Sequence, residues 1–142
     1  MPSTYNYLGI QKMATGEKAG TWGTLTNTNW DIIQQAASGY HSQSLNLVGA
    51  GANTTVLAIT DGDSTSTTDS LTNAARNQVI KLTAAITGNK IVTFPTDTEG
   101  LKVILNGTTG AYTVQLKGAS DTGSGTTFTT TDKGYKLVYM SG

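Results

Sequence analysis

Hydrophobic and polar residues alternate along the second two-thirds of the chain. In segment 79–83, Ile80 and Leu82 alternate with Val, Lys and Thr, and segment 112–117 repeats the pattern with Tyr, Val114 and Leu116 against Thr, Gln and Lys. A period of two places one set of side chains on each face of a strand. The pattern predicts eight strands, at residues 45–48, 54–60, 78–83, 90–95, 101–106, 111–117, 126–131 and 135–140.

Turn-forming residues separate these segments. They are clusters of Asp, Asn, Gly, Thr and Lys at residues 61–63, 87–89, 106–110 and 132–134. Such residues are typical of tight connections. About eight short strands at this spacing predict a mainly β protein whose core is an antiparallel β-sandwich of jelly-roll-like type. The one long connection, 62–77, has room for a helical turn in its second half.

A helix of about ten residues is predicted at 29–38, where the spacing of apolar residues changes. Asn27 or Thr28 is the expected N-cap, with Asp31 in the acidic position of a capping box. Gly39 stands where a left-handed residue commonly follows a helix.

One face of this predicted helix is apolar. Trp30, Ile33 and Ala37 recur at i, i+3 and i+7, which brings their side chains to one side. Ten residues are too few for a helix to be stable alone in water. We therefore expect this face to dock on the β domain or on a neighbouring chain.

The segment before the helix is rich in glycine and aromatic residues. Residues 4–13 are expected to form a short extended arm, and the loop that follows contains Gly16, Gly20 and Gly23. Glycine permits backbone angles that other residues avoid. The organisation predicts two parts: residues 1–48 for attachment or oligomerisation, and residues 49–142 for the β-sandwich.

Trp22 and Trp30 leave two alternatives open. Both rings cap the β core of their own chain, or one lies against a neighbouring subunit, where tryptophan is an enriched anchor. The glycines beside Trp22 allow a second backbone to approach closely, which favours a subunit contact.

Composition excludes several function classes. Charged residues make up 13% of the 142 residues, the formal net charge is zero, and cysteine is absent. Nucleic-acid binding needs a basic face, so no nucleic-acid partner is expected. The lack of cysteine removes disulfides and thiol chemistry. No apolar run approaches the roughly 20 residues that cross a bilayer, and no secretory signal opens the chain, so no membrane insertion is expected.

Few residues offer catalytic or metal-binding chemistry. His41 is the only histidine, and its place just after the helix favours a structural role. Asp61, Asp63 and Asp69 share a loop whose oxygens suit a hard cation such as Ca²⁺, but their spacing does not fit an EF-hand. A solvated loop is the simpler interpretation. We expect no enzyme activity, no cofactor and no metal site.

Residues 15–30 carry a more specific signal. They fit the pattern Thr-Gly-x-x-Ala-Gly-Thr-Trp-Gly-x-x-Thr-Asn-Thr-Asn-Trp, followed by a short helix ending in Ser-Gly. This motif resembles the amino-terminal module of bacteriophage tail-fibre and virion structural proteins, especially those of marine tailed phages. A looser similarity extends to about residue 140, through Ala75-Arg76, the strand at 79–83, a Val-x-x-Pro strand and the closing aromatic strand.

The resemblance implies a structural component of a tailed-phage virion, a small fibre-like or capsid-decoration subunit attached through its N-terminal module. The implied location is the virion, and the implied partners are the major capsid, portal, tail or fibre proteins. A homotrimer is expected. The expected interface or attachment residues are Gly20, Thr21, Trp22, Gly23, Asn27, Asn29, Trp30 and Ile33.

A carbohydrate-binding β module that contributes to host-surface adsorption is the alternative function. Tyr40, Tyr112 and Tyr135 have polar neighbours in the sequence and would stack on a sugar ring if they were exposed. Host-surface glycans would then be partners of the β half.

Overall fold

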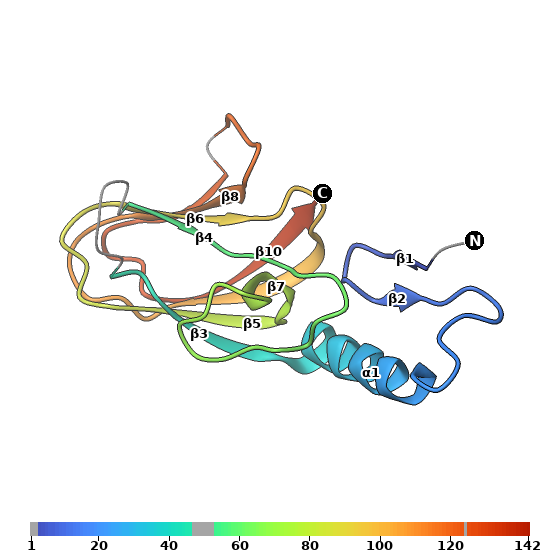
Figure 1. Cartoon of the computed structure of the whole chain (residues 1–142). Helices are drawn as coiled ribbons and strands as arrows, with labels where there is room; N and C mark the ends of the chain where they lie inside the picture. The colour runs from blue at the N-terminus through green and yellow to red at the C-terminus, as the bar shows by residue number, and fades with distance from the viewer. Residues whose placement is uncertain (1–2, 47–52, 124) are drawn as a thin grey trace.

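A computed structural model describes residues 3–46, 53–123 and 125–142. Two four-stranded sheets are stacked face to face, and a two-stranded hairpin and an α-helix lie beside one end of them (Figure 1). The elements are β1 (Thr4–Tyr5), β2 (Gln11–Lys12), α1 (Trp22–Ser38), β3 (Tyr40–Ser44), β4 (Thr54–Val56), the 3-10 helix η1 (Ala74–Arg76), β5 (Val79–Thr83), β6 (Lys90–Phe94), β7 (Glu99–Asn106), β8 (Val114–Gly118), β9 (Thr126–Phe128) and β10 (Gly134–Ser141).

The mainly β class is confirmed, but the sheets are mixed and not antiparallel throughout as predicted: of the described strands in the sandwich, only β7–β10 and β8–β9 pair antiparallel. The two sheets have the orders β10-β7-β5-β3 and β4-β6-β8-β9. In the first, β3, β5 and β7 run parallel; in the second, β4, β6 and β8 do. From β3 to β8, consecutive strands alternate between the sheets, so the crossover that these parallel strands require is a strand of the opposite sheet. A period-two pattern is the same for both kinds of pairing and does not reveal this.

The core lies between the two sheets. Ile80 and Leu82 of β5 face inward, as the alternation at 79–83 predicts, and so do Val114 and Leu116 of β8. Burying one such side chain contributes about 1.5–3 kcal/mol. The buried apolar cluster comprises Leu45, Leu57, Ala74, Ala75, Ile80, Leu82, Ile86, Val92, Phe94, Ile104, Val114, Leu116, Phe128 and Val138.

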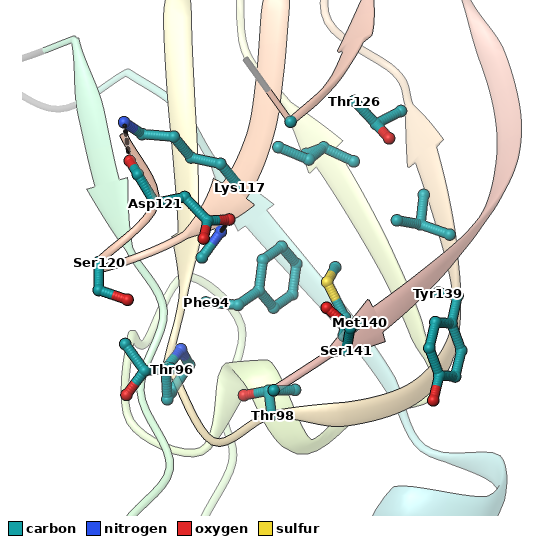
Figure 2. A pocket seen from close by; sticks show the side chains of 16 residues that line it. Phe94, Thr96, Thr98, Lys117, Ser120, Asp121, Thr126, Tyr139, Met140 and Ser141 are labelled. Atoms are coloured by element: carbon teal, nitrogen blue, oxygen red, sulfur yellow. Dashed lines mark hydrogen bonds between the residues drawn. The ribbon is translucent and has the colours of Figure 1, made fainter. Parts of the chain in front are cut away.

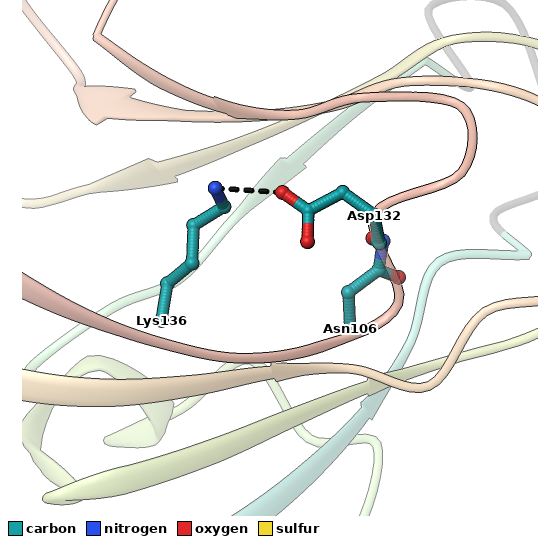
Figure 3. A network of polar contacts seen from close by, with 3 residues as sticks. All are labelled: Asn106, Asp132 and Lys136. Carbon is teal, nitrogen blue, oxygen red and sulfur yellow. Dashed lines mark hydrogen bonds and ion pairs between the residues drawn. The ribbon is translucent and has the colours of Figure 1, made fainter.

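A polar network at the turn before β10 holds this last strand against β7. The Lys136 Nζ lies 2.6 Å from the Asp132 carboxylate and 5.2 Å from the centre of the Phe128 ring. The Asn106 side-chain amide donates to the Asp132 carbonyl at 2.9 Å (Figure 3). Because Asn106 belongs to β7 and Lys136 to β10, the turn is tied to both strands. Eight residues of β10 pair antiparallel with β7.

The helix is longer than predicted. It begins at Trp22, and its N-cap residue Thr21 makes no side-chain capping hydrogen bond. Asn27 and Thr28, the predicted N-caps, lie inside the helix. Threonine and asparagine are poor helix formers, so local preference argued for a later start. A contact of Asn29 with the N-terminal hairpin supports the additional turns.

Gly39 follows the helix for a reason other than the one predicted. Its φ of −66° and ψ of 144° are extended, not left-handed. A Cβ at this position would collide with the Gln35 carbonyl oxygen and lie 2.5 Å from the Asn77 side-chain oxygen. The Gly39 N–H donates to the same Gln35 carbonyl at 2.9 Å. Close backbone approach, rather than a positive φ, requires glycine where α1 passes directly into β3.

Residues 4–13 form a hairpin instead of the single extended arm expected. β1 pairs antiparallel with β2. In the turn between them, the Asn6 side-chain oxygen accepts hydrogen bonds from the backbone of Leu8 and Ile10 at 3.0 and 2.9 Å. An asparagine that satisfies turn N–H groups in this way reverses the chain.

Most other elements occur within a few residues of their predicted positions. η1 is the helical turn predicted in the long connection. β4 ends earlier than predicted because the chain beyond it turns to the long connection, where the Ala58 N–H donates to the Leu71 carbonyl. β3 was missed, since Tyr-His-Ser-Gln-Ser lacks apolar alternation. Residues 47 and 48 of the strand predicted at 45–48, and the part boundary near residue 49, lie outside the described residues.

Candidate interaction surfaces

Helix α1 is fixed in place by the N-terminal hairpin. The Gln11 N–H donates to the Asn29 side-chain oxygen, and the Asn29 amide group donates to the Gln11 carbonyl, both at 3.0 Å. Ile32, on the same side of the helix, is completely buried. One face of α1 is therefore occupied by contacts within the chain.

The buried guanidinium of Arg76 ties three segments together. It donates to the carbonyls of Leu8 at 2.7 Å, Asp63 at 2.6 Å and Thr60 at 2.9 Å, and to the Gln35 side-chain oxygen at 3.0 Å. Burial lowers the pKa of Arg76, and the nearby Asp63 and Asp61 carboxylates oppose that shift. Because the hairpin, α1 and the long connection share this one cation, the helix is presented in a defined orientation.

A different side of α1 presents its aromatic residues to solvent. Trp22 is 63% exposed and Trp30 64% exposed, and Ile33 is exposed beside them. At 100° per residue, these three positions and Ala37 fall within about a quarter of the helix circumference. We call Trp22, Trp30, Ile33 and Ala37 the helix stripe. The alternative in which both tryptophans cap the β core of their own chain was wrong.

The remaining predicted interface residues have different roles. Gly20 and Thr21 precede the helix, and Gly20 has a φ of +82° with open space around it. Gly23 lies in the first turn without a positive φ, and Asn27 is exposed. Asn29 faces the hairpin and not the helix stripe.

A second apolar surface lies on the outer face of the sheet formed by β10, β7, β5 and β3. Register aligns Leu137, Val103, Val79 and Tyr40 in one row across all four strands. On one side of this row Tyr135 of β10 pairs with Leu105 of β7, and on the other side Tyr139 pairs with Leu101. Tyr135, Leu137 and Tyr139 are between 67% and 71% exposed. We call this surface the sheet face; its members are Tyr40, Val79, Leu101, Val103, Leu105, Tyr135, Leu137 and Tyr139.

Sequence reasoning found only part of the sheet face. Tyr40 and Tyr135, two of the tyrosines expected to stack on a sugar ring, both lie on it, at opposite edges. Tyr112 lies outside the strands, just before β8. The spacing of Tyr135, Leu137 and Tyr139 indicates one apolar face of a strand. Such a face is normally assigned to the core, whereas here it is exposed.

A small cavity opens at the end of the sandwich where β6, β8 and β10 finish (Figure 2). Its volume is about 120 Å³, and Phe94, Leu116, Val138 and Met140 contribute apolar walls. At its rim the Asp121 carboxylate accepts a hydrogen bond from the Gly118 N–H at 2.8 Å, while the Lys117 Nζ donates to the Asp121 carbonyl. The polar groups at the rim therefore serve to close the turn after β8.

A buried lysine sits beside η1. The Lys102 Nζ donates to the carbonyls of Arg76 and Asn77 at 3.0 and 3.1 Å, and the residue is 4% exposed. Burial, with a smaller effect from the charge of Arg76, lowers the pKa of Lys102 to about 8. No carboxylate forms an ion pair with it among the described residues. Its hydrogen bonds link β7 to the long connection.

The remaining candidate chemical groups have structural partners. His41 is buried, and its Nε2 lies 3.1 Å from the Gln43 side-chain oxygen. The Asp63 carboxylate accepts hydrogen bonds from the Thr65 N–H and the Asn73 amide, which hold its pKa below its usual value. The Asp69 carboxylate accepts the Ser44 N–H at the edge of β3. In the described segments, no group of three or more His, Cys, Asp or Glu residues is arranged to hold a metal ion.

None of the described helices is long and apolar enough to cross a membrane. Comparisons with protein-family models, with curated protein sequences and with solved structures find no match for this chain. The features that bear on its function are the two exposed apolar surfaces and the sequence motif around Trp22.

Proposed function

We propose that this protein is a structural subunit of a tailed-phage virion, fibre-like or decorating the capsid, that works by assembly and not by catalysis. Its N-terminal module attaches it to other virion proteins and joins it into a homotrimer. The observation that carries this proposal is the helix stripe, because two tryptophans on one rigidly held helix are placed for contact with another chain.

Three further properties support an assembly role. Arg76 and Asn29 fix the helix, so little conformational freedom is lost when its exposed side is covered. Exposed apolar patches of several hundred Å² mark interaction sites on proteins. The motif at residues 15–30 resembles the attachment module of phage fibre proteins, and it supplies both Trp22 and Trp30.

Position on the particle tests the virion role directly. Purified virions of the phage that encodes the chain should bind gold-labelled antibody at regular positions on the capsid or tail. Sedimentation of the recombinant protein should give a mass of three chains. Virions free of label, with the protein found only in the infected-cell lysate, would refute the structural role. A monomer at all concentrations would refute the trimer alone.

A carbohydrate-binding module remains the second candidate, favoured by exposed Tyr40, Tyr135 and Tyr139 on one sheet face. Leucine and valine side chains lie between these rings, however, whereas a sugar site also needs polar groups that bind hydroxyls. Binding to a glycan array that is lost in Tyr135→Ala would support this candidate. Formation of the trimer does not depend on glycan binding.

A further inference from the structure

The chain has two exposed apolar surfaces of different shape, and neither is covered by another part of the residues that the structure describes. The helix stripe is a convex ridge with two large rings, whereas the sheet face is a broad surface across four strands. We propose that the helix stripe of one copy packs on the sheet face of a second copy. This inference rests on the proposed assembly function and names the surface that receives the N-terminal module.

The helix cannot reach the sheet face of its own chain. α1 ends at Ser38 and β3 begins at Tyr40, so only Gly39 separates the two elements. In Figure 1 the helix extends beyond the end of the sheet, beside β1 and β2. The hydrogen bonds of Asn29 and Arg76 hold it there. A second copy is therefore needed to bring a helix onto this sheet.

The strand arrangement itself favours a covering helix. β3, β5 and β7 run parallel, and sheets with parallel strands normally have both faces covered, most often by helices. β7 contains an apolar run, Val103-Ile104-Leu105, of the kind typical of doubly buried strands, and β5 adds Val79 on the outer side. Here the inner side is covered by the second sheet, and the outer side is left open to solvent.

The dimensions of the two surfaces agree. From Trp22 to Ala37 the helix stripe spans about 22 Å at 1.5 Å per residue. The eight-residue strands β7 and β10 span about 26 Å at 3.3 Å per residue. An aromatic side chain buries 150–250 Å² when fully covered, so the exposed rings and aliphatic groups of both surfaces together offer roughly 1,000 Å². That area meets the lower limit of a specific interface.

The electrostatics also favour a copy of the same chain. Lys81, in the row of Leu105 and Tyr135, is the only charged residue within the three rows of the sheet face, Glu99 lies one row beyond Leu101, and the helix stripe has no charged residue. A strongly charged partner would find few groups with which to pair. The chain has a formal net charge of zero, so copies do not repel one another through net charge.

A contact between two different surfaces is heterologous, so an open oligomer of any length has one free stripe at one end and one free face at the other until a ring closes. Closure after three copies gives the homotrimer of the proposed function, with two such contacts per chain. A face-to-face dimer of two sheets would instead leave both helix stripes exposed.

Thiol cross-linking tests this arrangement, because the chain has no cysteine of its own. Ile33→Cys and Leu137→Cys are made in chains of different tag length, co-expressed, and treated with a flexible bismaleimide. We expect the mixed Ile33–Leu137 product to exceed either homodimer at least fivefold. A double Ile33→Cys, Leu137→Cys chain should give covalent products that end at three subunits.

Matched controls use exposed positions away from the two surfaces. Thr24→Cys lies on α1 but on the side opposite the helix stripe, and Thr127→Cys lies on β9 in the other sheet. When Thr24→Cys is used in place of Ile33→Cys, or Thr127→Cys in place of Leu137→Cys, the mixed cross-linked product should be lost. Adding Trp30→Ala to the Ile33→Cys chain should reduce the product at least fivefold, while circular dichroism confirms the fold.

Each alternative arrangement gives a different result. Ile33–Ile33 products in a protein that sediments as a trimer would mean helix-to-helix contacts, overturning this inference but not the trimer. Leu137–Leu137 products alone would mean pairing of two sheets, which also overturns it. A monomer without any cross-link would overturn both this inference and the proposed trimer.

Discussion

The side-chain amide of Asn29 and the backbone of Gln11 form two reciprocal hydrogen bonds, each 3.0 Å long. Asn29 lies in the middle of α1, and Gln11 begins the second strand of the N-terminal hairpin. The amide offers one donor and one acceptor to a backbone that presents the matching pair. This polar contact, together with the buried Ile32, determines which side of the helix faces the chain.

Replacing Asn29 with aspartate should destabilise the protein by about 1–3 kcal/mol, because the carboxylate loses the donor and faces the Gln11 carbonyl. Chemical denaturation measures this difference. Asn27→Asp, two residues earlier and exposed, is the matched control and should change stability by less than about 0.5 kcal/mol. Equal effects at both positions would show that the reciprocal pair contributes little.

Truncation of Trp30 should weaken assembly without weakening the fold. A buried aromatic anchor costs about 2 kcal/mol or more when removed from an interface, which is about thirtyfold in the association constant. Since Trp30 is largely exposed within one chain, the thermal unfolding of the monomer should hardly change. Sedimentation at several concentrations separates the two effects. Thr24→Ala on the same helix should leave association unchanged, and a Trp30→Ala protein that assembles normally would contradict the role of the helix stripe.

Two glycines in the N-terminal motif should respond in opposite directions to alanine. Gly20 has a φ of +82°, so Gly20→Ala should cost about 1 kcal/mol through backbone strain. Gly23 lies in the helix with open space around it, and Gly23→Ala should gain up to about 1 kcal/mol of stability. The sequence predicts a glycine loop at both positions, in which alanine would be unfavourable at each. Chemical denaturation of the two single variants measures these changes. A loss of stability in both variants would contradict the gain expected for Gly23→Ala.

The buried Lys102 predicts that stability rises with pH on the alkaline side. Its pKa is about 8 in the folded protein, against 10.5 for the free side chain. Between these values the unfolded state binds more protons, so raising the pH favours the folded state. Near pH 7 Lys102 is protonated in both the folded and the unfolded protein, so the full cost of burying its charge reduces the stability. By pH 9.5 most of it is relieved, which amounts to about 2 kcal/mol.

Urea unfolding at pH 7 and pH 9.5 measures this gain. Lys102→Met should remove the rise, while the exposed Lys12→Met should keep it. A wild-type stability that is flat or falls across this interval would mean that Lys102 keeps its proton through its hydrogen bonds to the Arg76 and Asn77 carbonyls.

The chain's sequence determined its mainly β class, most strand positions and the aromatic residues that became candidates for an interface. These follow from local chemistry. The alternation around Ile80 and Leu82 requires one buried face whatever the pairing of the strand. The spacing of Trp30, Ile33 and Ala37 places them on one side of any helix.

Only the tertiary structure decided which faces are covered and how the strands pair. Period-two patterning is identical for parallel and antiparallel neighbours, so the alternation of strands between two sheets was not visible. The stripe containing Trp30 is exposed because Asn29, Ile32 and Gln35 turn the other side of α1 inward toward Gln11 and Arg76. Those contacts join residues up to 41 positions apart. Tyr40 and Leu137, nearly a hundred residues apart in the sequence, lie on one row only because β3, β5, β7 and β10 assemble in that order, a long-range result of packing that no local pattern encodes.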